Sequence, residues 1–254
     1  MITTLIVLAH PEQASFNSAW SQASKIACED LGQRVLFSDL YSLGFDAAES
    51  NKHYPDLGCD GLFDPLKAQE RVSETGDIPT EIAREVVKLE QADQVIFHFP
   101  IWWFAPPAIL KGWFDRVFLH GRVHSVDERF DKGKYRGKSA MLCVSTGANE
   151  VECGFSGKEG DAKMWLWPVA QTLRYLGFTI KEPEIIHGVH GYHAGQKGDE
   201  LELRLGRVLE RQAALIAGLA ERSEWRFNRD HDFDEEGRLK SGSTSYSHFI
   251  RHEP

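Results

Sequence analysis

The chain has 254 residues, of which 42% are hydrophobic and 26% are charged, and its formal net charge at pH 7 is −9. These values are typical of a soluble globular protein and exclude a disordered, collagen-like or coiled-coil chain. The charged residues are scattered and form no basic stripe that could neutralise phosphates, so we expect no nucleic-acid partner.

Short apolar runs alternate with helical patterns along the chain. The runs typical of buried strands occupy residues 4–9, 34–38, 93–99, 139–145 and 178–186. The helical patterns occupy residues 18–31, 80–91, 110–118, 168–176 and 201–221. We expect Asn17 to cap the first helix and Gly32 to end it. Residues 41–78 read as a polar insertion without clear periodicity.

The alternation of apolar strands and helices predicts an α/β fold, with a doubly wound five-stranded parallel sheet in the order 2-1-3-4-5. Helices are expected on both faces of the sheet. We predict a single domain over residues 1–221, and a polar C-terminal extension over residues 222–254 that packs on the domain or on a partner subunit. In this order the ligand crevice lies where strands 1, 3 and 4 end.

Three loops meet at that crevice. Residues 10–17 (HPEQASFN) lead into a helix whose first amides can hold a phosphate. Residues 100–107 (PIWWFAPP) place three large rings in a turn, and residues 145–157 (STGANEVECGFSG) offer exposed backbone amides. There is no GxGxxG motif after the first strand and no Walker A loop. A flavin fits these loops, with its phosphate at the first loop and its isoalloxazine between the other two.

Further features bear on location and on metal binding. No segment approaches the length of a membrane span, and residues 1–13 read as a strand rather than a signal peptide. The cysteines, which we expect to be free thiols in a reducing cytoplasm, are Cys28, Cys59, Cys143 and Cys153. His187, His190 and His193 lie in a Gly-containing loop without an acidic or thiolate fourth ligand nearby, so we expect no metal site.

The motifs LIVLAHPEQASFN, SDLY, FPIWWFAPPAILKGWFDRVF, DKG and LWP resemble those of the NAD(P)H:quinone oxidoreductase (DT-diaphorase) family. The resemblance covers roughly the first 190 residues. It implies a flavodoxin-like fold, a homodimer, FAD in preference to FMN, and NADPH or NADH as the hydride donor. It also implies a quinone or related aromatic acceptor. Because donor and acceptor would share one open face of the flavin, we expect hydride transfer to flavin N5 and then two-electron transfer, with ping-pong kinetics.

Matching by position gives the cofactor-binding residues that the resemblance implies. The flavin diphosphate and ribityl region would contact His10, Ser15, Phe16 and Asn17. The isoalloxazine would be lined by Pro100, Ile101, Trp102, Trp103 and Phe104, with Ser145, Thr146, Gly147 and Ala148 at its pyrimidine edge. Asp115 would reach the flavin of the partner subunit. Since hydride transfer leaves negative charge near flavin N1 and O2, the amides of Gly147 and Ala148 are the expected stabilisers.

The chain departs from the family pattern at the expected catalytic positions. The tyrosine and the histidine that steady charge on the reduced flavin fall on Cys153 and Glu159. A deprotonated Glu159 would repel that charge, whereas the neighbouring Lys158 would stabilise it. The glutamine that contacts the adenosine falls on Asp64.

The expected substrate pocket also departs from the family pattern. Two tyrosines that line the quinone pocket fall on His124 and Val126, with Arg122 close by. The residues expected in this pocket are Trp103, Phe104, His124, Val126 and His190. Because the phenolic rings are replaced by titratable or permanent positive charge, the sequence predicts a preference for a polar or anionic acceptor.

Other interpretations stay open. The chain could be a flavodoxin-like electron carrier that binds FMN, or a regulatory flavoprotein subunit of a transporter. The Trp102-Trp103-Phe104 cluster could serve dimer packing, and Cys153 could be an ordinary thiol. The helix that contains Trp113 and Phe114 carries more aromatic surface than one sheet face needs, which predicts a homodimer interface on that helix.

Overall fold

The computed structural model describes residues 1–55 and 62–253. Its parallel sheet has the order β2-β1-β3-β4-β5, and β6 also pairs with β4. The strands are β1 (Thr3–Leu8), β2 (Arg34–Asp39), β3 (Gln94–Pro100), β4 (Ser139–Ser145), β5 (Thr179–Ile180) and β6 (Glu184–Ile186). The predicted order is therefore confirmed. The fifth predicted strand is split into β5 and β6, because Pro183 between them has no N–H to donate to a ladder.

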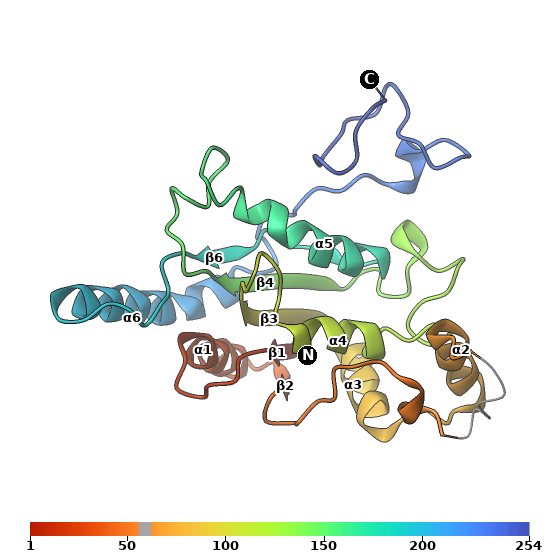
Figure 1. Cartoon of the computed structure of the whole chain (residues 1–254), viewed down its shortest axis with the longest axis horizontal. Coiled ribbons are helices and arrows are strands. Elements are labelled where there is room, and N and C mark those ends of the chain that lie inside the picture. Colours follow the sequence, from red (N-terminus) through yellow and green to blue (C-terminus); the bar gives the residue numbers. More distant parts are fainter. Residues whose placement is uncertain (56–61, 254) are drawn as a thin grey trace.

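Helices cover both faces of the sheet (Figure 1). They are α1 (Phe16–Asp30), α2 (Pro65–Thr75), α3 (Thr80–Gln91), α4 (Ala108–Val117), α5 (Ala162–Tyr175) and α6 (Gln196–Ala217). Side chains alternate along each strand. Leu5 and Phe97 therefore point toward α3, α4 and α5, whereas Ile6 and Ile96 point toward α1 and α6. The two faces form separate hydrophobic clusters.

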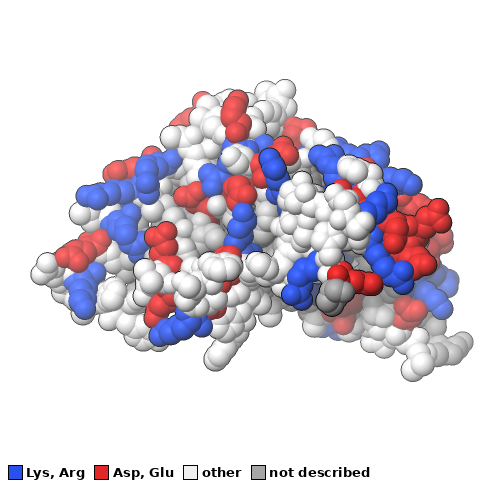
Figure 2. Space-filling model, turned by 90° about the horizontal axis from the view of Figure 1, so that it is seen from above, with Lys and Arg blue, Asp and Glu red and all other residues white. Residues whose placement is uncertain are grey.

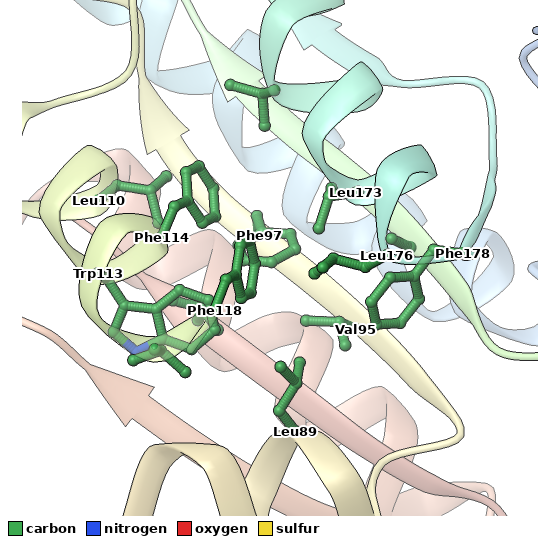
Figure 3. Packing of buried hydrophobic residues seen from close by; sticks show 14 of the residues in the cluster. Leu89, Val95, Phe97, Leu110, Trp113, Phe114, Phe118, Leu173, Leu176 and Phe178 are labelled. Carbon is green, nitrogen blue, oxygen red and sulfur yellow. The ribbon is translucent and has the colours of Figure 1, made fainter. Parts of the chain in front are cut away.

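The aromatic residues of α4 belong to the core of their own chain. Trp113, Phe114 and Phe118 are buried and surround Phe97 of β3, with ring centroids 6.0 Å apart for Phe97 and Trp113 and 5.6 Å apart for Phe97 and Phe114 (Figure 3). The indole Nε1 of Trp113 donates to Oε2 of the buried Glu85 at 3.0 Å. The prediction that these rings form an exposed dimer patch is wrong, because the sheet and neighbouring helices cover them.

Three local predictions also differ from the structure. Ser15, not Asn17, caps α1, while Gly32 follows its end at φ 70° as expected. The insertion contains α2, which begins at the cap Asp64 and ends at Gly76. Its residues 56–61, which include Cys59, lie outside the described residues. Helix α5 begins six residues before Pro168, so this proline lies inside the helix rather than at its start.

The C-terminal extension lies beyond α5 (Figure 1). The amide of Trp225 donates to the carbonyl of Ile180 at 2.8 Å, and the buried ring of Trp225 lies under Nζ of Lys163. Farther along, Phe249 stacks on Trp167 of α5 with ring centroids 4.6 Å apart. A groove of about 1130 Å³ separates the extension from residues 126–132.

The charge on one face and the character of the helices can be described for the same residues. On the face drawn in Figure 2, Lys and Arg side chains are interspersed with Asp and Glu, and no continuous basic stripe crosses it. Among the helices of residues 1–55 and 62–253, none combines the length and the apolar character needed to cross a lipid bilayer.

Candidate functional site

The three predicted loops meet at the carboxyl ends of β1, β3 and β4. Nδ2 of Asn17, in the first turn of α1, donates to Oγ of Ser145 at 2.7 Å. The amide of Ile101 donates to the carbonyl of Ser145 at 2.8 Å. The rings of His10 and Trp102 lie 6.1 Å apart. Residues from the three loops are thus neighbours in one chain, as the strand order requires.

The N-terminus of α1 has the chemistry of an anion site. Oγ of Ser15 accepts from the amide of Ser18 at 3.2 Å. Within the described part of the chain, the amides of Phe16 and Asn17 have no acceptor. The buried Oδ1 of Asn17 also lacks a donor among those residues; as an acceptor it suits a ligand hydroxyl and not the anion itself. Free amides at a helix N-terminus bind phosphate through both hydrogen bonds and the helix dipole.

His10 adds a neutral donor to this loop. Its Nδ1 lies 3.0 Å from the amide of Glu12 and 3.2 Å from the carbonyl oxygen of the same residue; because the amide can only donate, we assign Nδ1 as the acceptor and place the ring proton of the neutral form on Nε2. Burial lowers the pKa of His10 below its ordinary value. At neutral pH the ring therefore offers an N–H to a ligand without adding positive charge.

The aromatic loop makes a two-residue turn. The amide and the carbonyl of Trp102 pair with the carbonyl and the amide of Ala105 at 2.9 and 3.1 Å. Between them Trp103 and Phe104 have φ of 52° and 61°, which is the type I′ conformation that Asn and Gly normally occupy. Trp103 is 94% exposed and Phe104 is 50% exposed, and Phe104 contacts Trp165 edge to face with ring centroids 5.2 Å apart. Large rings thus stand beside the strand ends on a strained backbone.

The third loop presents backbone donors. Thr146 and Ala148 are fixed by the segment after β6, through bonds from the amide of Val189 to the carbonyl of Thr146 and from the amide of Gly188 to the carbonyl of Ala148, each 2.9 Å long. Gly147 between them is exposed. Among described residues no oxygen accepts from the amides of Gly147 and Ala148. Two donors are therefore available beside the aromatic turn, and the loop that contains His190 follows Val189 directly.

The three predicted catalytic side chains lie in the loop that follows Ala148. Cys153 is buried, and burial raises the pKa of its thiol, so it stays protonated at neutral pH. Nζ of Lys158 lies 2.9 Å from Oε1 of Glu152, so its charge is already paired. Glu159 is half-buried, and its amide donates to the carbonyl of Glu152 at 3.0 Å. This geometry gives Lys158 less capacity to stabilise a ligand anion than the sequence predicts.

The other predicted residues lie at the opposite end of the sheet. The ring of His124 packs edge to face on Tyr175, the last residue of α5, with centroids 5.6 Å apart. Trp165, which touches Phe104, lies ten residues earlier on the same helix, which corresponds to about 15 Å along the axis. Asp115 lines the same small cavity as His124 and is ion-paired with Lys111 at 2.5 Å. One subunit does not bring His124 and Phe104 into one pocket.

The positive charge expected at this far end is not free. Burial lowers the pKa of His124, so its ring is neutral at neutral pH. Arg122 is engaged by both carboxylate oxygens of Glu90, at 2.7 and 2.9 Å. Val126 is exposed and lines the groove below the C-terminal extension. The predicted preference for an anionic acceptor was derived from free positive charge at these positions, and it loses that basis.

Sequence reasoning missed one residue near the site and assigned another to a different role from the one it has. Trp165 supports Phe104, and it was missed because the helix was started at Pro168. Trp165 directly precedes the LWP motif, and this position was the signal in the sequence that could have identified it. Asp64 was matched to an adenosine contact, but its Oδ1 accepts from the amides of Leu66 and Lys67 and so caps α2.

The fold and the site define a flavodoxin-like α/β protein with an anion cradle and an aromatic turn at its strand ends. A family model of the flavodoxin-like fold matches residues 2–209. NAD(P)H dehydrogenase (quinone) 1 from Cavia porcellus is 38% identical over 187 residues, which cover 73% of this chain and 68% of that protein. Ribosyldihydronicotinamide dehydrogenase (quinone) from Mus musculus is 37% identical over 198 residues, which cover 73% of this chain and 81% of that protein.

A solved structure of a candidate quinone reductase from Klebsiella pneumoniae is also similar. It superposes with a TM-score of 0.84 at 27% identity, over 96% of this chain and 98% of that one. The chain belongs to the flavodoxin-like family of NAD(P)H dehydrogenases (quinone), and it is an oxidoreductase. The family resemblance read from the sequence motifs is confirmed.

Proposed function

We propose that the chain is a flavin-dependent NAD(P)H oxidoreductase that reduces a quinone or a related aromatic acceptor. The observation that carries the proposal is the unsatisfied cradle at α1, where two amides and the buried Asn17 Oδ1 lack partners among the described residues. An unpaired buried acceptor such as Asn17 Oδ1 is costly, and free amides at a helix N-terminus bind anions, so these groups together support a ligand that completes them. The relatives named above support the class of donor and acceptor.

The residues fit the three parts of a flavin. The amides of Phe16 and Asn17, with Nε2–H of His10, would hold the phosphate. The rings of Trp103 and Phe104 would cover the planar ring system. The amides of Gly147 and Ala148 would donate to its pyrimidine edge, where negative charge develops on reduction. When bound, the flavin supplies hydride acceptance at N5 and two-electron donation.

The acceptor pocket would be completed by a second copy of the chain. The contact of His124 lies about 15 Å along α5 from that of the aromatic turn of its own subunit, and Asp115 lines the same cavity as His124. The family resemblance pairs these positions with a flavin and quinone pocket. A homodimer in which the far end of one subunit faces the aromatic turn of the other would unite both sets.

Identification of the bound cofactor tests the proposal first. Flavin released from the purified chain and separated against FAD and FMN standards is expected to be FAD. A chain that neither retains flavin nor binds it on titration would overturn the proposal.

Steady-state kinetics then test the reaction. We expect oxidation of NADH or NADPH with a quinone, and parallel double-reciprocal plots, because donor and acceptor would use one open face in turn. Intersecting plots would exclude the ping-pong scheme. Turnover with purified components alone separates this function from an electron carrier or from a regulatory subunit of a transporter.

A further inference from the structure

A row of buried polar side chains ties α1 to β3 and to α6. Nε1 of Trp20 donates to Oε1 of Gln212 at 2.7 Å, and Nε2 of Gln212 donates to Oγ of Ser24 at 2.7 Å. Oγ of Ser24 lies 2.9 Å from Nε2 of His98. All four side chains are at most 1% exposed. We call Trp20, Gln212, Ser24 and His98 the α1 polar row.

The row has a direction, which follows from its first member. An indole N–H can only donate, so Gln212 accepts through its oxygen and must donate through its nitrogen. Ser24 then accepts from Gln212 and has one proton of its own to give. Among the described residues no other acceptor is bonded to Ser24 Oγ, so we assign the Ser24 proton to His98 Nε2 and the ring proton of His98 to Nδ1; a Ser24 oxygen that accepted from both neighbours would leave its own proton without a partner. Nδ1 of His98 has no partner among the described residues.

An ordinary helix is held on a sheet mainly by apolar contacts, whereas the position of α1 depends more on the hydrogen bonds of this row. Its buried face is made largely of small polar residues: Asn17, Ser18, Ser21 and Ser24. Apolar contact is non-directional, whereas hydrogen bonds fix distance and angle. The three hydrogen bonds of the row are made, and only Nδ1 of His98 lacks a partner among the described residues, so the row holds α1 at defined distances and angles. The row therefore sets both the height and the rotation of α1 over the sheet.

The row is connected to the N-terminal turn of α1. The ring of Phe16 stacks on Trp20, with centroids 5.2 Å apart and planes inclined by 30°. Trp20 in turn meets His98 edge to face at 5.2 Å. A change at His98 or Gln212 thus reaches Phe16 through one intervening side chain, and the amides of Phe16 and Asn17 are the unpaired donors of the cradle.

We propose that Trp20, Ser24, His98 and Gln212 are positioning residues, which orient the first amides of α1 toward the phosphate of the bound flavin. The inference rests on the proposed function at one point, the location of the flavin phosphate. None of the four side chains has to touch the ligand, because each acts through the placement of α1.

The main test is a flavin titration of the apoprotein, in which binding is monitored by the flavin fluorescence. His98→Leu and Gln212→Leu are expected to raise the Kd for FMN about tenfold, which corresponds to about one hydrogen bond. His98→Gln, which keeps an acceptor in the place of Nε2, is expected to stay within about twofold of the original chain. Thr4→Val is the matched control, since it removes the buried bond from Gln94 at the other end of the sheet. It should leave the Kd unchanged.

Two readouts separate positioning from a general loss of stability. The increase in Kd is expected for FMN, which has a phosphate, and not for riboflavin, which has none. An equal loss of affinity for FMN and for riboflavin would overturn the inference. In ¹⁵N spectra of histidine-labelled protein, His98 is expected as the Nδ1–H tautomer, and the Nε2–H tautomer would contradict the direction of the row.

The possible failures are distinguishable. If the original chain binds no flavin, the proposed function is wrong whatever the variants do. If it binds flavin and both His98→Leu and Gln212→Leu bind equally well, the positioning role is wrong and the function stands. If His98→Leu does not fold, Gln212→Leu and the tautomer measurement still decide the question.

Discussion

Trp103 and Phe104 hold backbone angles that side-chain-bearing residues rarely adopt, at φ 52° and 61°. A left-handed non-glycine residue costs about 1 to 2 kcal/mol. We therefore expect Trp103→Gly to raise the free energy of unfolding by about 1 kcal/mol while it weakens flavin binding. Urea unfolding and flavin titration measure the two effects. Trp103→Ala, which keeps the strain and loses the ring, should weaken binding without the gain in stability.

A second prediction at the scale of one residue concerns the effect of His98 on the pH dependence of stability. Complete burial lowers its pKa to about 3, so the folded chain keeps it neutral down to that pH. The unfolded chain takes up a proton below about pH 6.5. Stability is therefore unaffected above pH 6.5 and falls as the pH drops from 6.5 toward 3, by about 1.4 kcal/mol per unit.

The comparison with His98→Gln isolates this contribution. The variant has no titrating group at this position, so its free energy of unfolding should fall less steeply between pH 6 and pH 4. Other buried histidines contribute equally to both proteins and cancel in the difference. Equal slopes in urea-unfolding series would show that His98 is protonated in the folded chain.

At the scale of elements, Gly112 allows α4 to lie against the segment that follows β2. A Cβ on Gly112 would stand 2.1 Å from the carbonyl oxygen of Ala47, which is backbone and cannot rotate away. We expect Gly112→Ala to destabilise the chain by about 2 kcal/mol. Gly206→Ala on α6 is the control, since nothing lies within 4 Å of its position. It should stabilise by about 0.5 to 1 kcal/mol through helix propensity.

The elements that were predictable from the sequence are those with strong periodic signals. The central strands β1, β3 and β4 were found because they are largely apolar runs that are buried on both faces. Helix α2 was missed because its buried face is only Ala68, Gln69 and Val72, too short a stripe to stand out among polar residues. The start of α5 was misplaced because a proline usually opens a helix, whereas Pro168 is accommodated inside it.

The candidate site was predictable only in part, for a different reason. Motif matching located the three crevice loops, because strand order alone brings them together. It could not show that His124 and Phe104 lie at opposite ends of α5, since matching assigns positions within a family and not within one subunit. Nor does WWF signal a type I′ turn, because it contains neither Gly nor Asn.

At the scale of the whole molecule, the proposed two-subunit pocket predicts that two different damaged chains complement each other. Trp103→Ala damages the aromatic turn, and His124→Leu damages the far end that would face the partner. Each homodimer would then have two damaged pockets, and the activity of each is expected to be low. A mixed dimer would combine both changes in one pocket and leave the other intact. We expect it to recover about half of the original activity.

The measurement uses differently tagged chains, which are co-expressed and purified through both tags. A mixture of the separately purified homodimers, assayed before exchange, is the control. Mixed dimers no more active than the two homodimers would mean that each pocket is built within one chain. A chain that sediments as a monomer at assay concentration would exclude the shared pocket altogether.

The strand order leaves β2 at the edge of the sheet, with consequences for how the chain meets other molecules in a crowded solution. The amides of Arg34 and Leu40 bond to β1, so even-numbered residues face that neighbour and odd-numbered residues face outward. An outward row of free amides and carbonyls invites a strand of another molecule. Nζ of Lys88 donates to the outward carbonyl of Phe37 at 3.1 Å and to Oγ of Ser38 at 2.9 Å. A charged side chain that occupies an edge acceptor protects the apolar RVLFSD strand from adding to a growing aggregate.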